Sequence, residues 1–362
     1  MKVVIFAGGF GKRLWPLSRK SIPKQFHKIY EDMTTLEHAY WPLAKKYGIE
    51  NIYISTTKDY YDHIKGIIKN VSDSNLILEP SSRDNGPAVA YAMNYLYKKF
   101  PEDKILIRWQ NSIIQNEQIF LFMLDKAEES FDQHKLDLVY FAVPIKFPST
   151  NVGYIKVSEK LFSFGEDISV YKFESFIEKP SIDKAIEYFS NSKVYFWNPG
   201  TYITTPKFIL ENLSVTSPSI FNLIQRINEV SDEKEILRLY NLMPRISIDY
   251  ALWEKLPNNN IHVFVSDYGW YYLSTWTDLK IALLNKQKGS TSFCKGLVEL
   301  SDSSNNLILN YVKNKLVCLV GINNVNVINT EDVLLVVHDS KSAEIKKIYD
   351  MLDEKYNQKY TN

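Results

Sequence analysis

The chain begins with a short, uninterrupted apolar run at residues 3–6, VVIF, which is typical of a strand buried on both faces of a sheet. Further strand-like runs follow at residues 51–55, 75–78, 105–109 and 138–143. Between them, apolar residues recur at helical intervals in four stretches, at residues 34–48, 59–69, 87–100 and 117–131. Thr34 and Glu37 have the spacing of a capping box at the start of the first of these helices. This alternation predicts an α/β domain with a mostly parallel, mixed sheet and helices on both faces.

A polar stretch of small residues at 286–292, KQKGSTS, interrupts this pattern, and we place a domain boundary there. Beyond it, residues 296–337 alternate short apolar runs with Asn, Asp, Ser and Gly turns, at a spacing that fits the coils of a parallel β-helix. A final helix is predicted over residues 342–356, with apolar positions at Ile345, Ile348 and Leu352. The prediction is therefore a large domain, residues 1–285, and a small β-helix-like domain with a terminal helix, residues 293–362.

Composition narrows the class of protein. Of the 362 residues, 45% are hydrophobic, which is enough for a sizeable core. The formal net charge of +1 argues against a broad nucleic-acid-binding surface. No apolar run is long enough to span a bilayer and no signal peptide precedes the first strand, so we expect a cytoplasmic protein that binds no membrane. Cys294 and Cys318 lack metal-ligand spacing, and we expect both to be reduced.

The candidate chemistry starts where the first strand ends, at the sequence AGGFGKR. Gly8, Gly9 and Gly11 would let backbone N–H groups approach an anionic ligand closely. Residues 12–24, at the end of this sequence and just after it, carry five cations, which are Lys12, Arg13, Arg19, Lys20 and Lys24. Because ligands of such sheets lie beyond the carboxyl ends of the strands, we interpret this loop as a phosphate cradle. The spacing is that of neither a Walker A loop nor a complete Rossmann fingerprint, and an ordinary strand-to-helix turn is the alternative.

The longer string RLWPLSR…PKQF, residues 13–26, closely resembles the signature of sugar-1-phosphate nucleotidylyltransferases, in the form found in the mannose-1-phosphate guanylyltransferase branch. This resemblance implies a Rossmann-like, GT-A-like nucleotidyltransferase domain, to which the family often appends a β-helix. It also implies that the loop holds a nucleoside triphosphate through residues Ala7, Gly8, Gly9, Gly11, Lys12, Arg13 and Lys24.

The segment EPSSRDNGPA, residues 79–88, resembles the family element that contacts the guanine base and ribose. The resemblance implies that Arg83, Asp84 and Asn85 bind the nucleotide. A polar segment at the start of a helix is also a suitable place for a ligand in its own right. A simple capped turn at this helix start is the alternative interpretation.

Four further motifs resemble family elements and follow in the family's order: NVGYI, FIEKP, WNPG and SIDYA. By resemblance, Gly153 leaves room for the sugar, Glu178 binds sugar hydroxyls, Lys179 binds the sugar phosphate and Asn198 contributes to sugar recognition. A strand exit is the alternative interpretation of the Glu178-Lys179-Pro180 sequence.

In the family that these motifs resemble, a phosphate oxygen of a sugar 1-phosphate attacks the α-phosphorus of the nucleoside triphosphate, and pyrophosphate leaves. The protein positions two anions that repel each other and stabilises charge on the α-phosphate. The resemblance therefore implies catalytic roles for Arg13 and Lys24 on the triphosphate and for Lys179 on the sugar phosphate. It also implies a Mg²⁺ cofactor.

The sequence departs from the family at both metal positions. Asn111 stands where the family has its first metal-binding aspartate, with Ser112 at the neighbouring histidine position. Tyr272 replaces the second aspartate. Loss of two carboxylates should weaken Mg²⁺ binding by orders of magnitude. Lys12 stands where a small hydroxyl residue is usual, and either compensates for the ion or is solvated.

Three functions therefore follow from the sequence. The favoured one is a guanylyltransferase that makes GDP-mannose from GTP and mannose 1-phosphate. The second is a catalytically silent regulatory homologue that binds a nucleotide or GDP-sugar. The third is a transferase for another sugar 1-phosphate, because the NVGYI and WNPG variants fall at the sugar site. The resemblance implies a homodimer, or a hetero-oligomer with an active homologue.

Overall fold

The computed structural model describes residues 1–257, 260–287 and 289–362. Its contacts divide the chain into two compact units. The first unit comprises Met1–Gly8, Ala39–Gln110 and Asn116–Trp270, and the second comprises Gly9–His38, Asn111–Gln115 and Tyr271–Asn362. The glycine-rich loop therefore leaves the first unit after Gly8 and continues in the second.

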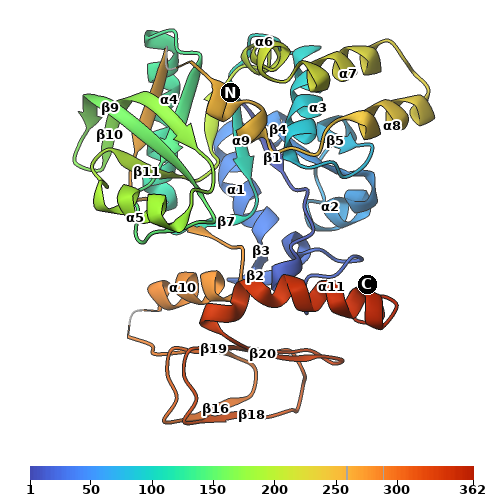
Figure 1. The fold of residues 1–362 in the computed structure, drawn as a ribbon, viewed down its shortest axis with the longest axis vertical. Helices are drawn as coiled ribbons and strands as arrows, with labels where there is room; N and C mark the ends of the chain where they lie inside the picture. The colour runs from blue at the N-terminus through green and yellow to red at the C-terminus, as the bar shows by residue number, and fades with distance from the viewer. Residues whose placement is uncertain (258–259, 288) are drawn as a thin grey trace. The chain divides into compact units, whose positions relative to one another are not determined.

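The first unit contains a ten-stranded sheet with the order β11-β9-β10-β13-β8-β12-β6-β1-β4-β5 (Figure 1). Its strands with parallel neighbours are β1 (Lys2–Phe6), β4 (Ile52–Thr57), β5 (Leu76–Glu79), β6 (Ile105–Trp109), β8 (Leu138–Ala142) and β13 (Ile261–Val265). The strands whose pairings are all antiparallel are β9 (Gly153–Phe164), β10 (Ile168–Ile177), β11 (Tyr195–Asn198) and β12 (Tyr202–Thr204). This confirms the predicted mixed sheet, in which β1 lies between two parallel neighbours.

Helices cover both faces of this sheet because successive strand residues point to opposite sides. On one face, Val4 of β1 and Ile107 of β6 share a core with Met93 of α3. On the other, Phe141 of β8 contacts Phe120 of α4, with ring centroids 6.3 Å apart. The helices up to residue 251 are α1 (Thr35–Tyr47), α2 (Tyr61–Ile67), α3 (Asn85–Tyr97), α4 (Glu117–Gln133), α5 (Ile182–Ser190), α6 (Pro206–Thr216), α7 (Pro218–Asn228), α8 (Glu233–Leu242) and α9 (Ile248–Ala251).

The second unit contains the predicted β-helix-like strands (Figure 1). Its larger sheet has the order β15-β17-β19-β20, with the first three strands parallel and β20 antiparallel to β19. These strands are β15 (Phe293–Lys295), β17 (Leu307–Asn310), β19 (Val325–Asn329) and β20 (Leu334–His338). A second pair, β16 (Val298–Ser301) and β18 (Val317–Val320), is also parallel. A small core that includes Ile308, Leu319 and Val327 holds the coils together.

The rest of the second unit packs around Trp276, which is fully buried. Its indole N–H donates to the carbonyl of Trp15 at 2.9 Å, so the segment after the glycine loop shares a core with α10 and α11. The remaining elements are β2 (Lys28–Tyr30), β3 (Met33–Thr34), β7 (Ser112–Ile114), β14 (Trp270–Tyr272), α10 (Trp276–Lys286) and α11 (Ile345–Lys355). The boundaries of the two compact units therefore differ from the domain boundary predicted at 286–292. That boundary stays a prediction, and Lys288 within it lies outside the described residues.

The last helix differs in detail from its prediction. It begins at Ile345, because residues 339–344 form a 3-10 turn. Ile345 is buried, whereas the side chain of Ile348 is 44% exposed and Tyr349 takes the buried position. Cys294 and Cys318 are both free and exposed. Within the described ranges, no helix is long and apolar enough to cross a bilayer.

Candidate active site

The glycine-rich loop turns sharply after β1. Gly9 has a φ of +91° and Gly11 a φ of +68°, both in the region that favours glycine. A Cβ on Gly11 would lie 2.6 Å from Cδ of Lys24, so the absence of a side chain lets the Lys24 stem lie against the loop. Ala7, the residue after β1, donates its N–H to the carbonyl of Ser55 at 2.8 Å.

Three of the five loop cations form ion pairs with the C-terminal segment of the same unit. These pairs are Lys12–Asp350 (2.6 Å), Arg19–Asp332 (2.7 Å) and Lys20–Asp353 (2.7 Å). The ammonium of Lys12 also lies 5.1 Å from the ring centroid of Tyr349. Lys12 is therefore directed at α11, an arrangement that sequence reasoning missed because its partner is far along the chain.

The other two loop cations, Arg13 and Lys24, lie close enough for their positive charges to repel each other. Nζ of Lys24 donates to the carbonyl of Leu273 at 2.9 Å. Burial lowers the pKa of this ammonium to about 8; the negative charge of Asp278 opposes the shift and the positive charge of Arg13 adds to it. A bound phosphate would relieve both the burial cost and the repulsion, so the pair is suited to hold an anion.

The two predicted metal positions are adjacent. The N–H of Leu273, the residue after Tyr272, donates to the carbonyl of Asn111 at 2.9 Å, and β7 pairs with β14. Their side chains offer an amide and a phenol, and the ammonium of Lys24 is bonded to the same Leu273. Across the described ranges, no group of three or more His, Cys, Asp or Glu side chains is placed to hold a metal ion.

A carboxylate near this position is already engaged. Asp278 lies in the first turn of α10, and its Oδ2 accepts hydrogen bonds from Ser274 N (3.1 Å), Ser274 Oγ (2.7 Å) and Thr275 N (2.8 Å). These three donors fix the carboxylate as a helix cap. The donor set at Asn111 and Tyr272 therefore does not fit Mg²⁺, which proteins usually hold through one or two carboxylates.

In the first unit, the end of β5 carries a buried acid. Glu79 accepts hydrogen bonds from Tyr240 Oη at 3.0 Å and from Ser55 Oγ at 3.4 Å. Burial raises its pKa to about 7. Its Oε1 would lie 3.9 Å from a Cβ on Gly8, so the acid stands next to the last residue of the first unit before the loop continues. Glu79 is the first residue of the EPSSRDNGPA motif, but no role for it was predicted from the sequence.

The predicted nucleotide-binding residues after Glu79 have structural partners. Asp84 caps α3 with a φ of +78° and accepts from the N–H of Asn85 at 2.7 Å. Oδ1 of Asn85 accepts from the N–H of Ile248 at 2.7 Å. Arg83 donates to the carbonyl of Met243 at 2.6 Å. Asp84 therefore caps the turn, Asn85 contacts the first residue of α9, and Arg83 contacts the segment between α8 and α9. The nucleotide-binding role of the three residues stays a prediction.

The four predicted sugar-site residues lie together. Strand pairing places Asn198 of β11 opposite Gly153 of β9. A Cβ on Gly153 would lie 2.7 Å from Oε2 of Glu178. The ammonium of Lys179 lies 2.5 Å from Oε1 of Glu178, and the backbone of Lys179 adopts a left-handed φ of +42°. Asn198 is oriented by its own bond to Tyr202 Oη at 2.8 Å.

Two further acids surround this cluster. Glu254 accepts from the N–H of Glu178 at 2.8 Å. Burial, with the charge of Glu178, raises the pKa of Asp249 to about 7. We call Gly153, Glu178, Lys179, Asn198, Asp249 and Glu254 the sugar-side cluster. Asp249 was missed as a site residue, although the SIDYA motif contained it.

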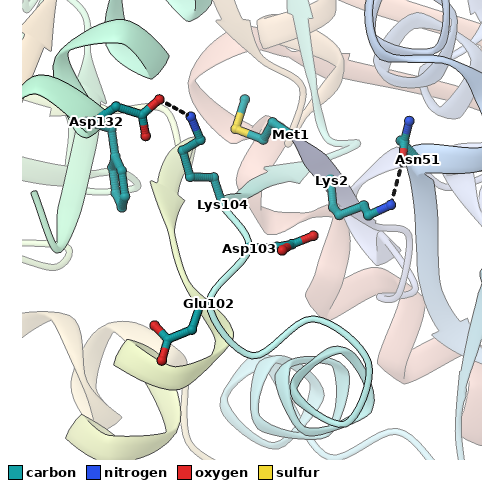
Figure 2. Close-up of a pocket in the computed structure, with 8 residues that line it drawn as sticks. Met1, Lys2, Asn51, Glu102, Asp103, Lys104 and Asp132 are labelled. Carbon is teal, nitrogen blue, oxygen red and sulfur yellow. Dashed lines mark hydrogen bonds and ion pairs between the residues drawn. The ribbon is translucent and has the colours of Figure 1, made fainter. Parts of the chain in front are cut away.

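A separate cavity of about 430 Å³ lies at the amino ends of β1 and β6 (Figure 2). Two of its lysines already have partners: Lys104 forms an ion pair with Asp132 at 2.6 Å, and Lys2 donates a hydrogen bond to Asn51 at 2.7 Å. Because the glycine loop follows the carboxyl end of β1, this cavity is not part of the candidate site.

Comparison with known proteins identifies the fold's family. A family model described as "Nucleotidyl transferase" matches residues 2–280. The chain belongs to the nucleotidyl transferase family. A second model, "MannoseP isomerase/GMP-like beta-helix domain", matches residues 298–352 of this nucleotidyl transferase. Together the matches confirm the predicted class of enzyme, a sugar-1-phosphate nucleotidyltransferase with a C-terminal β-helix.

Relatives of this nucleotidyl transferase cover nearly all of it. "Mannose-1-phosphate guanylyltransferase 2" of Escherichia coli O157:H7 is 29% identical over 361 residues, which span 96% of this chain and 73% of the relative. "Mannose-1-phosphate guanylyltransferase" of Escherichia coli is 29% identical, over 97% of this chain and 75% of the relative. A solved structure described as a mannose-1-phosphate geranyltransferase of Thermus thermophilus has the same fold, with a TM-score of 0.84, 24% identity and coverage of 97% of this chain and 99% of that one.

Members of this family generally use a divalent metal such as Mg²⁺. The side chains at the two predicted metal positions, Asn111 and Tyr272, do not fit such an ion for the reasons given above. The fold of the family is therefore present, and the assignment of these two residues to its metal site stays a prediction.

Proposed function

We propose that this nucleotidyl transferase makes GDP-mannose and pyrophosphate from GTP and mannose 1-phosphate. The observation that carries the proposal is the sugar-side cluster, in which Lys179 pairs with Glu178 beside Gly153, and two further acids, Asp249 and Glu254, interact with Glu178. Such an arrangement suits a sugar phosphate, because carboxylates accept from hydroxyls while the ammonium neutralises phosphate. The names of the relatives agree with this substrate.

Guanine is supported by the buried Glu79. Its carboxylate is the right partner for a base edge that presents two adjacent donors, as guanine does with N1–H and N2–H, whereas adenine presents an acceptor at N1. The hydrogen bonds from Tyr240 and Ser55 keep the carboxylate in place. A pKa of about 7 leaves a substantial fraction ionised at neutral pH, and donors from the base would increase that fraction.

In the proposed reaction a phosphate oxygen of mannose 1-phosphate attacks the α-phosphorus of GTP. The new P–O bond forms as the bond between the α-phosphorus and the bridging oxygen breaks, and pyrophosphate leaves with that oxygen. Lys179 holds the sugar phosphate, and Arg13 with Lys24 holds the triphosphate and stabilises charge on it. No protein nucleophile is required, because positioning and charge stabilisation supply the catalysis.

A second function, a silent homologue that binds nucleotide or GDP-sugar, is favoured by one observation, the loss of carboxylates at Asn111 and Tyr272. A transferase for another sugar 1-phosphate also remains as an alternative. We further expect a cytoplasmic location, and a homodimer or a hetero-oligomer with an active homologue, as the sequence predicts.

The test is pyrophosphate release by the purified chain with each pairing of GTP, ATP, UTP or dTTP with mannose 1-phosphate or glucose 1-phosphate. We expect release with GTP and mannose 1-phosphate, lost in Lys179→Ala and kept in Lys184→Ala, a control on the exposed face of α5. Release with another pairing would replace the proposed substrates. Binding of GDP-mannose without release under any pairing would favour the silent homologue.

A further inference from the structure

We infer that this chain binds guanine nucleotide without a protein-held divalent ion, and that the position formed by Asn111, Tyr272 and Lys24 contacts the nucleotide directly. The inference rests on the proposed function for the identity of the nucleotide. It goes beyond that function because the family generally uses a divalent metal at this step.

Backbone geometry brings the two replaced positions together. Asn111 and Tyr272 come from distant parts of the sequence, yet the backbone bond from Leu273 N to Asn111 O, 2.9 Å long, fixes them side by side. Nζ of Lys24 bonds to the carbonyl of the same Leu273. A divalent ion there would have an amide, a phenol and an ammonium as neighbours, and the ammonium would repel it.

Substitute carboxylates are committed elsewhere. Asp278 is the carboxylate whose charge acts on Lys24, but its Oδ2 receives three donors at the start of α10. Asp350, on the helix that faces the loop, is paired with Lys12 at 2.6 Å. If Asp278 bound a metal, the start of α10 would lose its hydrogen-bond acceptor, and if Asp350 did so, Lys12 would lose its ion pair.

The same groups suit a phosphate. The Asn111 amide and the Tyr272 hydroxyl can donate hydrogen bonds, and Lys24 and Arg13 supply positive charge. A phosphate oxygen that a metal would otherwise neutralise therefore has donors from the protein itself. In this chain a site for a cation has become a site for an anion.

Titration calorimetry with GDP-mannose tests the inference on the native chain. We expect the dissociation constant measured with excess Mg²⁺ and with excess EDTA to agree within about threefold. A loss of affinity of about tenfold or more in EDTA would overturn the inference while leaving the proposed nucleotide intact. Failure to bind GDP-mannose in either buffer would overturn the proposed function and the inference with it.

Mn²⁺ provides a direct readout of the ion, because its electron paramagnetic resonance signal falls when it binds protein. We expect the native chain, with GDP-mannose present, to leave the signal at the level of GDP-mannose alone. Asn111→Asp/Tyr272→Asp should remove about one equivalent of free Mn²⁺, since paired carboxylates restore the missing ligands. Stoichiometric Mn²⁺ binding by the native chain would contradict the inference.

A matched control makes the same change of charge at exposed positions away from the site. Asn314→Asp/Tyr97→Asp serves this purpose, because Asn314 lies in an exposed turn and Tyr97 is 42% exposed. We expect no Mn²⁺ binding by this variant. Thermal unfolding by circular dichroism verifies that both double variants fold, and the calorimetry on the native chain does not depend on either.

Discussion

The sugar-side cluster and the predicted metal position differ in the charge of their side chains. In the cluster, the ammonium of Lys179 pairs with Glu178, and Glu178 interacts in turn with two further acids, Asp249 and Glu254. Asn111 and Tyr272, by contrast, carry no formal charge, and the neighbouring Leu273 accepts a hydrogen bond from the ammonium of Lys24. In the proposed function, the carboxyl groups lie where sugar hydroxyls need acceptors, and none lies at the predicted metal position. The two proposals together imply that sugar recognition in this chain does not require metal ligands.

The largest effect should follow removal of the cation from the sugar-side cluster. Lys179→Met leaves Glu178 and Asp249 without the neighbouring cation and removes the group proposed to hold the sugar phosphate. We expect kcat/KM for mannose 1-phosphate to fall by about 10²–10³. Steady-state pyrophosphate release measures this, with Lys184→Met as the control. A change below about tenfold would remove Lys179 from the proposed mechanism.

The next effect is on the pH dependence of stability, and it comes from Asp249 of the sugar-side cluster. The pKa of Asp249, raised from 3.8 to about 7, means that the folded protein binds this proton more tightly than the unfolded chain does. Protonation of Asp249 therefore adds to the free energy of unfolding at low pH, by a total on the order of 4 kcal/mol. This contribution is fully present below about pH 4, falls between about pH 4 and 7, and does not change further above pH 7. The titratable groups that interact with Asp249 include Glu178, Lys179, Tyr140, Tyr202 and Tyr250, and the Ser247 side chain forms a hydrogen bond with it.

Asp249→Asn should therefore reduce the fall in the free energy of unfolding between pH 5 and pH 8. Glu79 has a raised pKa in the same range, so we expect a reduced dependence and not its abolition. Urea unfolding at the two pH values measures it, with the exposed Asp183→Asn as the control. An unchanged dependence would show that Asp249 is ionised throughout this range in the folded protein.

A smaller effect is expected at the glycine loop. Gly11→Ala places a Cβ at a φ of +68° and 2.6 Å from Cδ of Lys24, whereas Gly165→Ala has a similar φ of +62° and open space. Both variants should lose about 1 kcal/mol of stability from the backbone alone. Only Gly11→Ala should also weaken GDP-mannose binding, because it displaces Lys24. Equal affinity in the two variants, measured by calorimetry, would argue against a role for Lys24 in binding.

The smallest effect should come from releasing Lys12. Asp350→Asn breaks a partly exposed ion pair, for which a change in stability of about 1 kcal/mol or less is expected. The freed ammonium would be available to a phosphate, so GDP-mannose affinity should rise by up to about threefold at low salt and less at high salt. Asp353→Asn, which breaks the neighbouring pair with Lys20, is the comparison. A loss of affinity in Asp350→Asn alone would mean that the pair positions the loop.

Local signals predicted most of the fold. The run at residues 3–6 predicted a strand because its residues are apolar throughout, and the structure confirms it as β1. The capping box is also confirmed, by mutual bonds between Thr34 and Glu37 at 2.8 and 3.1 Å. Ile348 was placed at an apolar position of the last helix, but only tertiary packing decides that Tyr349 is the buried residue.

The site was harder to predict, because its contacts join distant residues. Lys12 and Asp350 are 338 positions apart, and no periodicity links them. The roles of Glu79 and Asp249 depend on burial, which a motif does not reveal. By contrast, motif order was enough to predict that Gly153 and Asn198 belong to one site, and strand register places them opposite each other.

The most direct test of the whole account is pyrophosphate release from GTP and mannose 1-phosphate by the native chain, beside Arg13→Ala, Arg226→Ala and Asn111→Asp/Tyr272→Asp. The account predicts release by the native chain and by Arg226→Ala, an exposed control, and loss of release in Arg13→Ala. Silence of the native chain together with activity in the double variant would contradict it. That result would identify a degenerate transferase in which the missing carboxylates, and not the retained cations, decide the function.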